Sequence, residues 1–150
     1  MGPPSERHSA DLDQLVAYWR AKRDTLGHLP GRADIDPVEM RFALGHLLLV
    51  EVERGPRMRF RHRLIGTHIV DRAGYDATGL CLDEIPDAEL AARVSESYLA
   101  VLATKEPVRQ TLDDIVDGRS TKLALVRLPL AGDGTNVDMI LSAAYFDRTA

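Results

Sequence analysis

The segment Met58–Gly66 constrains the fold most, because apolar and basic residues alternate along it one for one. Met58, Phe60, His62 and Leu64 alternate with Arg59, Arg61 and Arg63. Successive side chains of a strand point to opposite faces of a sheet. The alternation therefore predicts an antiparallel strand with one buried face and one cationic face.

A second strand is predicted immediately upstream, at Leu47–Arg54. Its apolar run changes into an alternation that contains Glu51 and Glu53, and Gly55-Pro56-Arg57 separates it from the arginine strand. Such a short separator between two strands is typical of a β-hairpin. We expect the glutamates to face the arginines, each pair of opposite charges adding roughly 0.2–1 kcal/mol.

Length and charge narrow the possible partners. The chain has 150 residues and a formal net charge of −4, which fits one domain and offers no basic field for nucleic acid or an anionic membrane. Cys81 is the only cysteine, so no internal disulfide can form and a cytoplasmic location is expected. No apolar run has the length of a membrane span or of a signal-peptide core, and residues 1–10 are expected to be a disordered lead-in.

Helical periodicity and glycine or proline punctuation predict four helices around the hairpin. They run from Asp11 to Gly27, from Pro37 to residue 45, from Gly66 to Gly74, and from Asp87 towards Pro107. Three further strands are predicted at Val108–Ile115, Thr121–Leu130 and Val137–Phe146. Sequential, hairpin-joined strands form one antiparallel sheet, and the helices between its second and third strands must cover one face. The fold class is therefore α+β.

Five short motifs are spread along nearly the whole chain. They are YW at Tyr18-Trp19, LPGRADIDP at Leu29–Pro37, RFRHRLIGT at Arg59–Thr67, GYDATG at Gly74–Gly79 and PLAGDG at Pro129–Gly134. In this combination they resemble a bacterial family of short, stand-alone PAS-domain proteins. The resemblance implies a single PAS-like domain over residues 1–150, with N-terminal helices in 11–45 and a PAS core in 46–147. It also implies a five-stranded antiparallel sheet in the order 2-1-5-4-3, with a pocket between the sheet and the crossover helices and a flanking helix at the N-terminus.

A pocket-lining set is expected where the long crossover helix meets the inner face of the strands. Its members are Val50, Val52, Phe60, His62, Tyr98, Leu102 and Met139. Aliphatic cavities with one or two polar groups are the usual small-molecule sites. The composition of this set favours an apolar or mixed ligand over a sugar or a nucleotide.

His62 has two interpretations, because it lies on the apolar face of its strand between Phe60 and Leu64. A buried imidazole needs partners for its ring nitrogens. These can come from a ligand, or from a backbone carbonyl or a hydroxyl such as that of Tyr98. The second interpretation is preferred.

No cofactor, metal site or catalytic site is expected. Haem ligation would need a histidine on Leu90–Lys105, which has none, and flavin photochemistry would need a cysteine in a polar motif, whereas Cys81 has apolar neighbours. The five histidines lack the spacing of zinc ligands. No nucleophile elbow or phosphate-binding motif is present, so the chain is expected not to be an enzyme. A small cone-fold enzyme that moves a proton with His62 remains an alternative.

The first helix also has two interpretations. Its apolar stripe, Leu12, Leu15, Val16 and Trp19, can pack on the outer face of the sheet or meet a second copy of the chain. The second interpretation, a dimer interface, is favoured. The resulting hypothesis is a cytoplasmic, homodimeric PAS sensory domain that binds a small molecule or a protein partner and signals through protein contact. A pure interaction module with a solid core is the alternative.

Overall fold

The computed structural model describes residues 6–116 and 119–148. The elements follow in the order α1 (Glu6–Leu26), η1 (Arg32–Asp34), η2 (Pro37–His46), β1 (Leu47–Glu53), β2 (Arg59–Ile65), α2 (Thr67–Ala73), η3 (Leu82–Glu84), α3 (Ala88–Thr104), β3 (Val108–Val116), β4 (Arg119–Leu130) and β5 (Met139–Arg148), where η denotes a 3₁₀ helix. Among these residues no helix combines the length and the apolar character needed to cross a bilayer.

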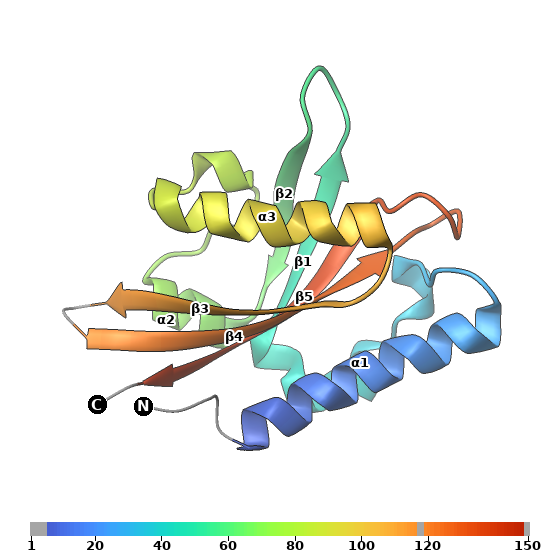
Figure 1. Cartoon of the computed structure of the whole chain (residues 1–150), viewed down its shortest axis with the longest axis horizontal. Helices are drawn as coiled ribbons and strands as arrows, with labels where there is room; N and C mark the ends of the chain where they lie inside the picture. The colour runs from blue at the N-terminus through green and yellow to red at the C-terminus, as the bar shows by residue number, and fades with distance from the viewer. Residues whose placement is uncertain (1–5, 117–118, 149–150) are drawn as a thin grey trace.

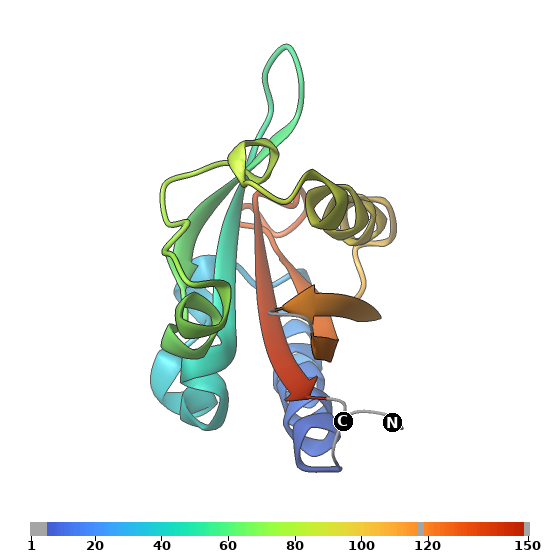
Figure 2. The same ribbon diagram turned by 90° about the vertical axis from the view of Figure 1, so that its left-hand side faces the viewer.

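The strands form one antiparallel sheet in the order β2-β1-β5-β4-β3. This confirms the predicted α+β class and the 2-1-5-4-3 order. In Figure 1, β3 and β4 run between α3 above and α1 below, and Figure 2 shows the β1–β2 hairpin projecting from the body. The crossover helices cover the inner face of the sheet, and α1 covers its outer face.

The two central strands β4 and β5 are buried on both faces. Every residue of Leu123–Leu130 and of Ile140–Tyr145 is buried, although alternate residues of a strand point in opposite directions. A strand that helices cover on both faces is apolar at every position rather than at every second one. The continuous apolar runs of β4 and β5 therefore mean that both faces of the central sheet must be covered.

The β1–β2 hairpin forms as predicted and carries the expected charge pairs. Arg61 binds Glu53 with an N–O distance of 2.7 Å, and Arg63 binds Glu51. The register shifts between Leu49 and Val50, where Leu49 faces Leu64 and Val50 faces His62. Arg63 is therefore an extra residue at a β-bulge.

The bulge corrects the predicted strand alternation. Beyond it, Leu64 leaves the inner face and is 47% exposed, whereas Ile65 pairs with Leu48 and takes the inner position. Met58, also expected on the buried face, is exposed and precedes β2. A single extra residue turns all following side chains to the other face.

Helix α1 begins at Glu6, so the prediction that residues 1–10 are disordered is wrong for residues 6–10; residues 1–5 lie outside the described part of the chain. The helix was predicted to begin at Asp11, but Asp11 lies inside it, where its carboxylate accepts a hydrogen bond from the Tyr145 hydroxyl at 3.2 Å. Within the added residues, the His8 ring lies 4.9 Å from the Tyr145 ring of β5 between centroids, a contact with a distant residue that no local signal shows.

The apolar stripe of α1 packs on the sheet of its own chain. Its four residues, Leu12, Leu15, Val16 and Trp19, are all buried in the single chain. Trp19 also donates a hydrogen bond from Nε1 to the Pro129 carbonyl oxygen of β4 at 2.8 Å. The interpretation of this stripe as a dimer interface is therefore wrong for this structure, because the apolar surface is already covered by β4 and β5.

Replacing Leu15 by Ala is expected to lower the free energy of unfolding by about 2–5 kcal/mol, because the side chain is fully buried and its loss leaves a cavity. The loss should not depend on protein concentration, since the contact is internal. Chemical denaturation at two protein concentrations checks both points. Arg20→Ala, at an exposed position of the same helix, is the control and should change stability by about 0.5 kcal/mol or less. A midpoint that rises with concentration in the wild type and not in Leu15→Ala would contradict the internal packing.

Candidate ligand pocket

A cavity of about 450 Å³ lies on the inner face of the sheet, beneath α2, η3 and the first half of α3. Its floor consists of side chains from β4 and β5, namely Leu123, Leu125, Arg127, Ala144 and Phe146. Leu123, Leu125 and Arg127 share this face because they are alternate residues of one strand. The roof consists mainly of Ile69, Ile85, Leu90 and Val94. The size and the mainly apolar lining are typical of a small-molecule site.

Two of the seven predicted lining residues, His62 and Tyr98, contribute to the wall of this cavity. Val50, Val52 and Phe60 lie on the same face but belong to the filled part of the core, where the Phe60 ring packs against Tyr98 at 4.9 Å between centroids.

The other two predicted residues lie elsewhere. Leu102 is in the second half of α3, beyond the cavity. Met139 pairs with Glu51, which places it on the outer face, opposite to the prediction. The cavity thus lies nearer to α2 than predicted, because the second half of α3 closes over the other half of the sheet.

His62 is held at the pocket wall by the connector that precedes η3. Its Nδ1 lies 2.8 Å from the Leu80 carbonyl oxygen, and its backbone N–H donates to the same oxygen at 2.9 Å. The backbone N–H of Gly79 in turn donates to the His62 carbonyl oxygen at 2.8 Å. The preferred interpretation, a core histidine bonded to a backbone carbonyl, is borne out. The same side chain also faces the cavity.

The tautomer and charge of His62 follow from these contacts. A carbonyl only accepts, so Nδ1 must carry a proton and Nε2 is the acceptor of the neutral ring. Burial lowers the pKa of His62, the Leu80 carbonyl partly opposes this, and the positive charge of Arg127 lowers the pKa further. His62 is therefore neutral at physiological pH.

Arg127 places a charged guanidinium in the wall of this apolar cavity. The side chain is 1% exposed, and its guanidinium carbon lies 4.6 Å from the centre of the Tyr98 ring. Its Nε donates to Ser97 Oγ at 3.2 Å, whereas the buried Nη1 has no hydrogen-bond partner. Within the described residues, no carboxylate forms an ion pair with it. Burial lowers the pKa of Arg127, and a stacked ring offsets only about 2 kcal/mol of such a desolvation cost.

Two hydroxyl groups beside Arg127 are also unsatisfied. The Tyr98 hydroxyl and the Ser142 hydroxyl are buried and have no partner in the described structure. Ser142 lies directly across from Arg127 in the β4–β5 register. Burial raises the pKa of Tyr98, against the effect of the Arg127 charge, so its phenol stays protonated. Arg127 and Tyr98, which both line the cavity, therefore each carry a buried donor group without a partner, whereas Ser142 does not line it.

Sequence reasoning identified Tyr98 but missed Arg127 and Ser142. One signal was available, because Arg127 is the only charge within the apolar run Leu123–Leu130. A single arginine in such a run of a central strand indicates a buried charge, and buried charges need a partner. Ser142 gave no such signal, since small hydroxyl residues are common in buried strands.

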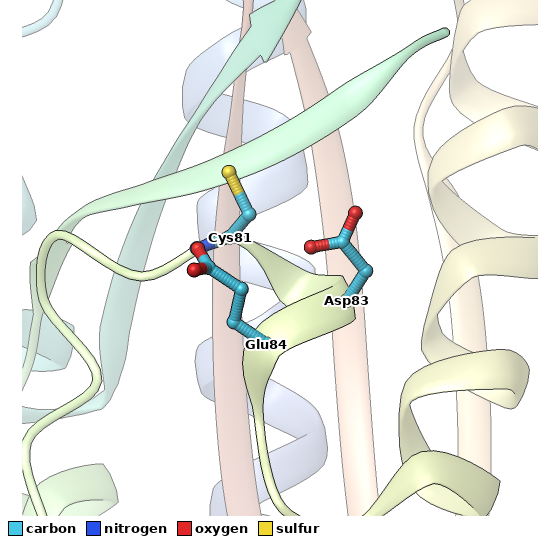
Figure 3. A group of neighbouring side chains, drawn as sticks. All are labelled: Cys81, Asp83 and Glu84. Atoms are coloured by element: carbon cyan, nitrogen blue, oxygen red, sulfur yellow. The ribbon is translucent and has the colours of Figure 1, made fainter.

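A second group of side chains, Cys81, Asp83 and Glu84, surrounds the start of η3 (Figure 3), and its ligand atoms lie within 4.8 Å of one another. The group is already satisfied by protein contacts. Asp83 accepts two hydrogen bonds from Arg59, at 2.7 and 3.0 Å, and lies 3.3 Å from Arg57. Glu84 accepts from the backbone N–H of Cys81 at 2.8 Å. Two arginines oppose a metal cation here, and burial raises the pKa of the Cys81 thiol, so the arrangement is that of a turn and its ion pairs.

A five-stranded antiparallel sheet with a ligand-sized cavity beneath its crossover helices is the architecture that the motifs implied. The sequence matches the family model described as PAS domain over residues 7–144. The chain belongs to the PAS domain family, as its motifs indicated. No curated protein matches the sequence.

Two solved structures with TM-scores of 0.50 share the fold at low identity, and others are similar with lower scores. The Rhodobacter sphaeroides LOV protein is 13% identical with a TM-score of 0.50, and the match covers 92% of this chain and 67% of that one. A light-oxygen-voltage domain studied with a flavin analogue is 16% identical with a TM-score of 0.50, over 74% and 82% of the two chains. The PAS domain of Bordetella pertussis BvgS is 21% identical with a TM-score of 0.48, over 76% and 87%. One further LOV structure is matched over 59% of its own length.

Acidification is expected to destabilise the protein in the range where histidines titrate. Above the ordinary histidine pKa of 6.5, His62 is neutral in both the folded and the unfolded chain. As the pH falls below this value, the unfolded chain takes up the proton first, so stability is lost until the lowered folded-state pKa is passed. His46, whose pKa burial also lowers, acts in the same direction. Urea denaturation between about pH 7.5 and pH 5 measures the loss.

The variant His62→Asn can keep the hydrogen bond to Leu80 and removes the titrating ring. It should reduce the slope of stability against pH and leave the contribution of His46. The difference in stability between the variant and the wild type should be constant above about pH 7.5, where both rings are neutral. An unchanged slope in His62→Asn would show that the ring is not buried as a neutral group.

Proposed function

We propose that this protein is a sensory PAS domain that binds a small molecule in the cavity beneath α2, η3 and α3. It signals by contact with another protein and catalyses no reaction itself. The observation that carries the proposal is the cavity of about 450 Å³, whose wall is apolar except for a few polar groups. The alternative with a solid core is less well supported, because the space lies directly beside His62 and Tyr98.

The roof of the cavity is the element most able to respond to a ligand. Helix α2 has no buried residue and is bounded by Gly66 and Gly74, the latter in the left-handed conformation with φ of 85°. Such a short, weakly packed element costs little to displace. A ligand that contacts Ile69 of α2 and Leu90 of α3 from below would favour one arrangement of the roof and change the surface offered to a partner.

Catalysis by His62 is the less favoured alternative. Its lowered pKa would allow it to act as a base. Its Nδ1 is committed to Leu80, and no nucleophile or acid–base partner touches it among the described residues. A general base without such partners supports binding better than turnover.

We also propose that the ligand is not a flavin held through a cysteine adduct. Light-oxygen-voltage structures are among those that share the fold, and one of these domains was studied with a flavin analogue. The Cys81 thiol lies 3.9 Å from the Glu53 carboxylate, in an ion-pair environment rather than the apolar one expected, and it does not line the cavity. A thiol that does not line the cavity supports a ligand bound without a cysteine adduct. A visible flavin absorption band in the purified protein that bleaches on illumination and is lost in Cys81→Ala would refute this.

The output is proposed to be a contact with a protein partner or with a second copy in the cytoplasm. The apolar stripe of α1 is used inside the chain, so a homodimer must use other surfaces. Native mass spectrometry of the purified protein reports the subunit count and any small molecule retained in the cavity.

Filling the cavity should abolish binding without unfolding the protein. Ala144→Leu adds a branched side chain to the floor of the pocket, and Ala92→Leu makes the same change at an exposed position of α3. A panel of small apolar and mixed molecules is screened by thermal denaturation. A compound present at roughly 100 times its Kd should raise the Tm of the wild type and Ala92→Leu by about 5–10 °C. The Tm of Ala144→Leu should not rise.

Circular dichroism confirms that both variants keep the secondary structure of the wild type. Compounds that raise the Tm of Ala144→Leu as much as that of the wild type bind elsewhere and would contradict the pocket. The absence of any stabilising compound, together with no retained molecule in the native mass spectrum, would favour the solid-core interaction module.

A further inference from the structure

The geometry points to an amphipathic monocarboxylate as the class of ligand, with its carboxylate bound to Arg127 and its apolar body in the rest of the cavity. The inference rests on the proposed function and narrows it. Its starting point is that Arg127 is 1% exposed while its Nη1 has no partner. A buried cation without a counter-charge is costly, and an anion from outside the chain would supply that charge.

The groups around Arg127 are donors, which suits an acceptor-rich ligand group. The Tyr98 hydroxyl and the Ser142 hydroxyl are buried and unpartnered. The Tyr98 ring stacks on the guanidinium, and Ser142 faces Arg127 across the β4–β5 pair. Ser97 already donates to the Val94 carbonyl at 2.8 Å and accepts from Arg127 Nε, so it fixes the arginine side chain. A carboxylate has two oxygens that can take a guanidinium in a bidentate pair and a hydroxyl donor beside it.

The charges that line the pocket favour a ligand with one negative charge over a ligand with two. Arg127 is the only fully buried cation in the lining. The other arginine there, Arg72, is half-buried and lies over the Phe146 ring at 5.5 Å. Asp87, also in the lining, adds a negative charge that opposes a second one on the ligand. The remaining wall is apolar, which requires an apolar body.

The first experiment compares matched probes on the unmodified protein. Octanoate, octan-1-ol and octyl phosphate share one chain and differ in the head group, and 4-phenylbutyrate with 4-phenylbutan-1-ol repeats the comparison for an aromatic body. Isothermal titration calorimetry at pH 7.5 gives each Kd. We expect each acid to bind about 10- to 100-fold more tightly than its alcohol, the value of one charge-assisted pair. Octyl phosphate should bind more weakly than octanoate.

The second experiment removes the positive charge of Arg127 from the pocket. Arg127→Met keeps an unbranched side chain, and Arg109→Met makes the same change at an exposed arginine that pairs with Asp13 on the other side of the sheet. Arg127→Met should bind acid and alcohol with similar Kd, whereas Arg109→Met should keep the preference for the acid. The Tm of the ligand-free Arg127→Met protein should equal or exceed that of the wild type, because an unpaired buried charge has been removed. A purely structural arginine would give a lower Tm.

Tyr98→Phe is the second variant and keeps the proposal testable if Arg127→Met does not fold. It removes a hydroxyl that has no partner in the chain, so the fold should persist while octanoate binds several-fold more weakly. Three results would each overturn the carboxylate assignment. They are equal affinity of the wild type for acid and alcohol, tighter binding of octyl phosphate than of octanoate, and an undiminished preference of Arg127→Met for the acid. In these cases the pocket still binds small molecules, so the proposed sensory function survives. If no probe binds, this inference fails, and the cavity-filling screen then decides separately whether the proposed function fails as well.

Discussion

The burial of β4 and β5 on both faces is the constraint on which the rest of the structure depends. Every residue of Leu123–Leu130 and of Ile140–Tyr145 is buried, so neither face of the central sheet can be left to solvent. The chain covers the outer face with α1, which comes from its N-terminus, and the inner face with the crossover between β2 and β3. The outer cover is a single long helix that packs closely. The inner cover is made of α2, η3 and α3, which do not fill the space beneath them, and the cavity is the result.

Because Arg127 lies at its wall, the cavity beneath the crossover helices costs more free energy than imperfect packing alone would. An empty apolar cavity costs some stability, but a buried guanidinium with an unpaired Nη1 at its wall costs more, and the Tyr98 ring and Ser97 offset only part of that cost. A chain that needed only a filled core could place an aliphatic residue at this point of the run. The energetic cost and the unused donors coincide at one wall, which favours a ligand-binding role over a structural one.

The sequence predicted the secondary structure well where one local signal decided it. The alternation of apolar and charged residues predicted β1 and β2, and glycine and proline residues predicted the ends of α2 and α3. The predicted bounds of β3, β4 and β5 differ from the structure by two residues or fewer. The errors arose where a distant contact decided. Helix α1 begins before Asp11, where His8 packs against Tyr145 of β5. The bulge at Arg63 reverses the side of Leu64. Which half of the inner face stays open depends on where α3 packs, so only His62 and Tyr98 of the predicted set line the cavity.

Strand β4 connects the two covers directly. Arg127 faces the cavity, and two residues later the Pro129 carbonyl oxygen accepts the hydrogen bond from Trp19 of α1. A strand paired on both sides is the stiffest element of the sheet, so it does not itself switch between two arrangements. Helix α1 contacts the sheet through one buried stripe. Proximity alone does not establish coupling, which requires an element with two arrangements whose balance the ligand alters. We propose α2 as that element on the pocket side and α1 as its counterpart on the other, so a signal that crosses the sheet would have to appear as a change in the packing of Trp19.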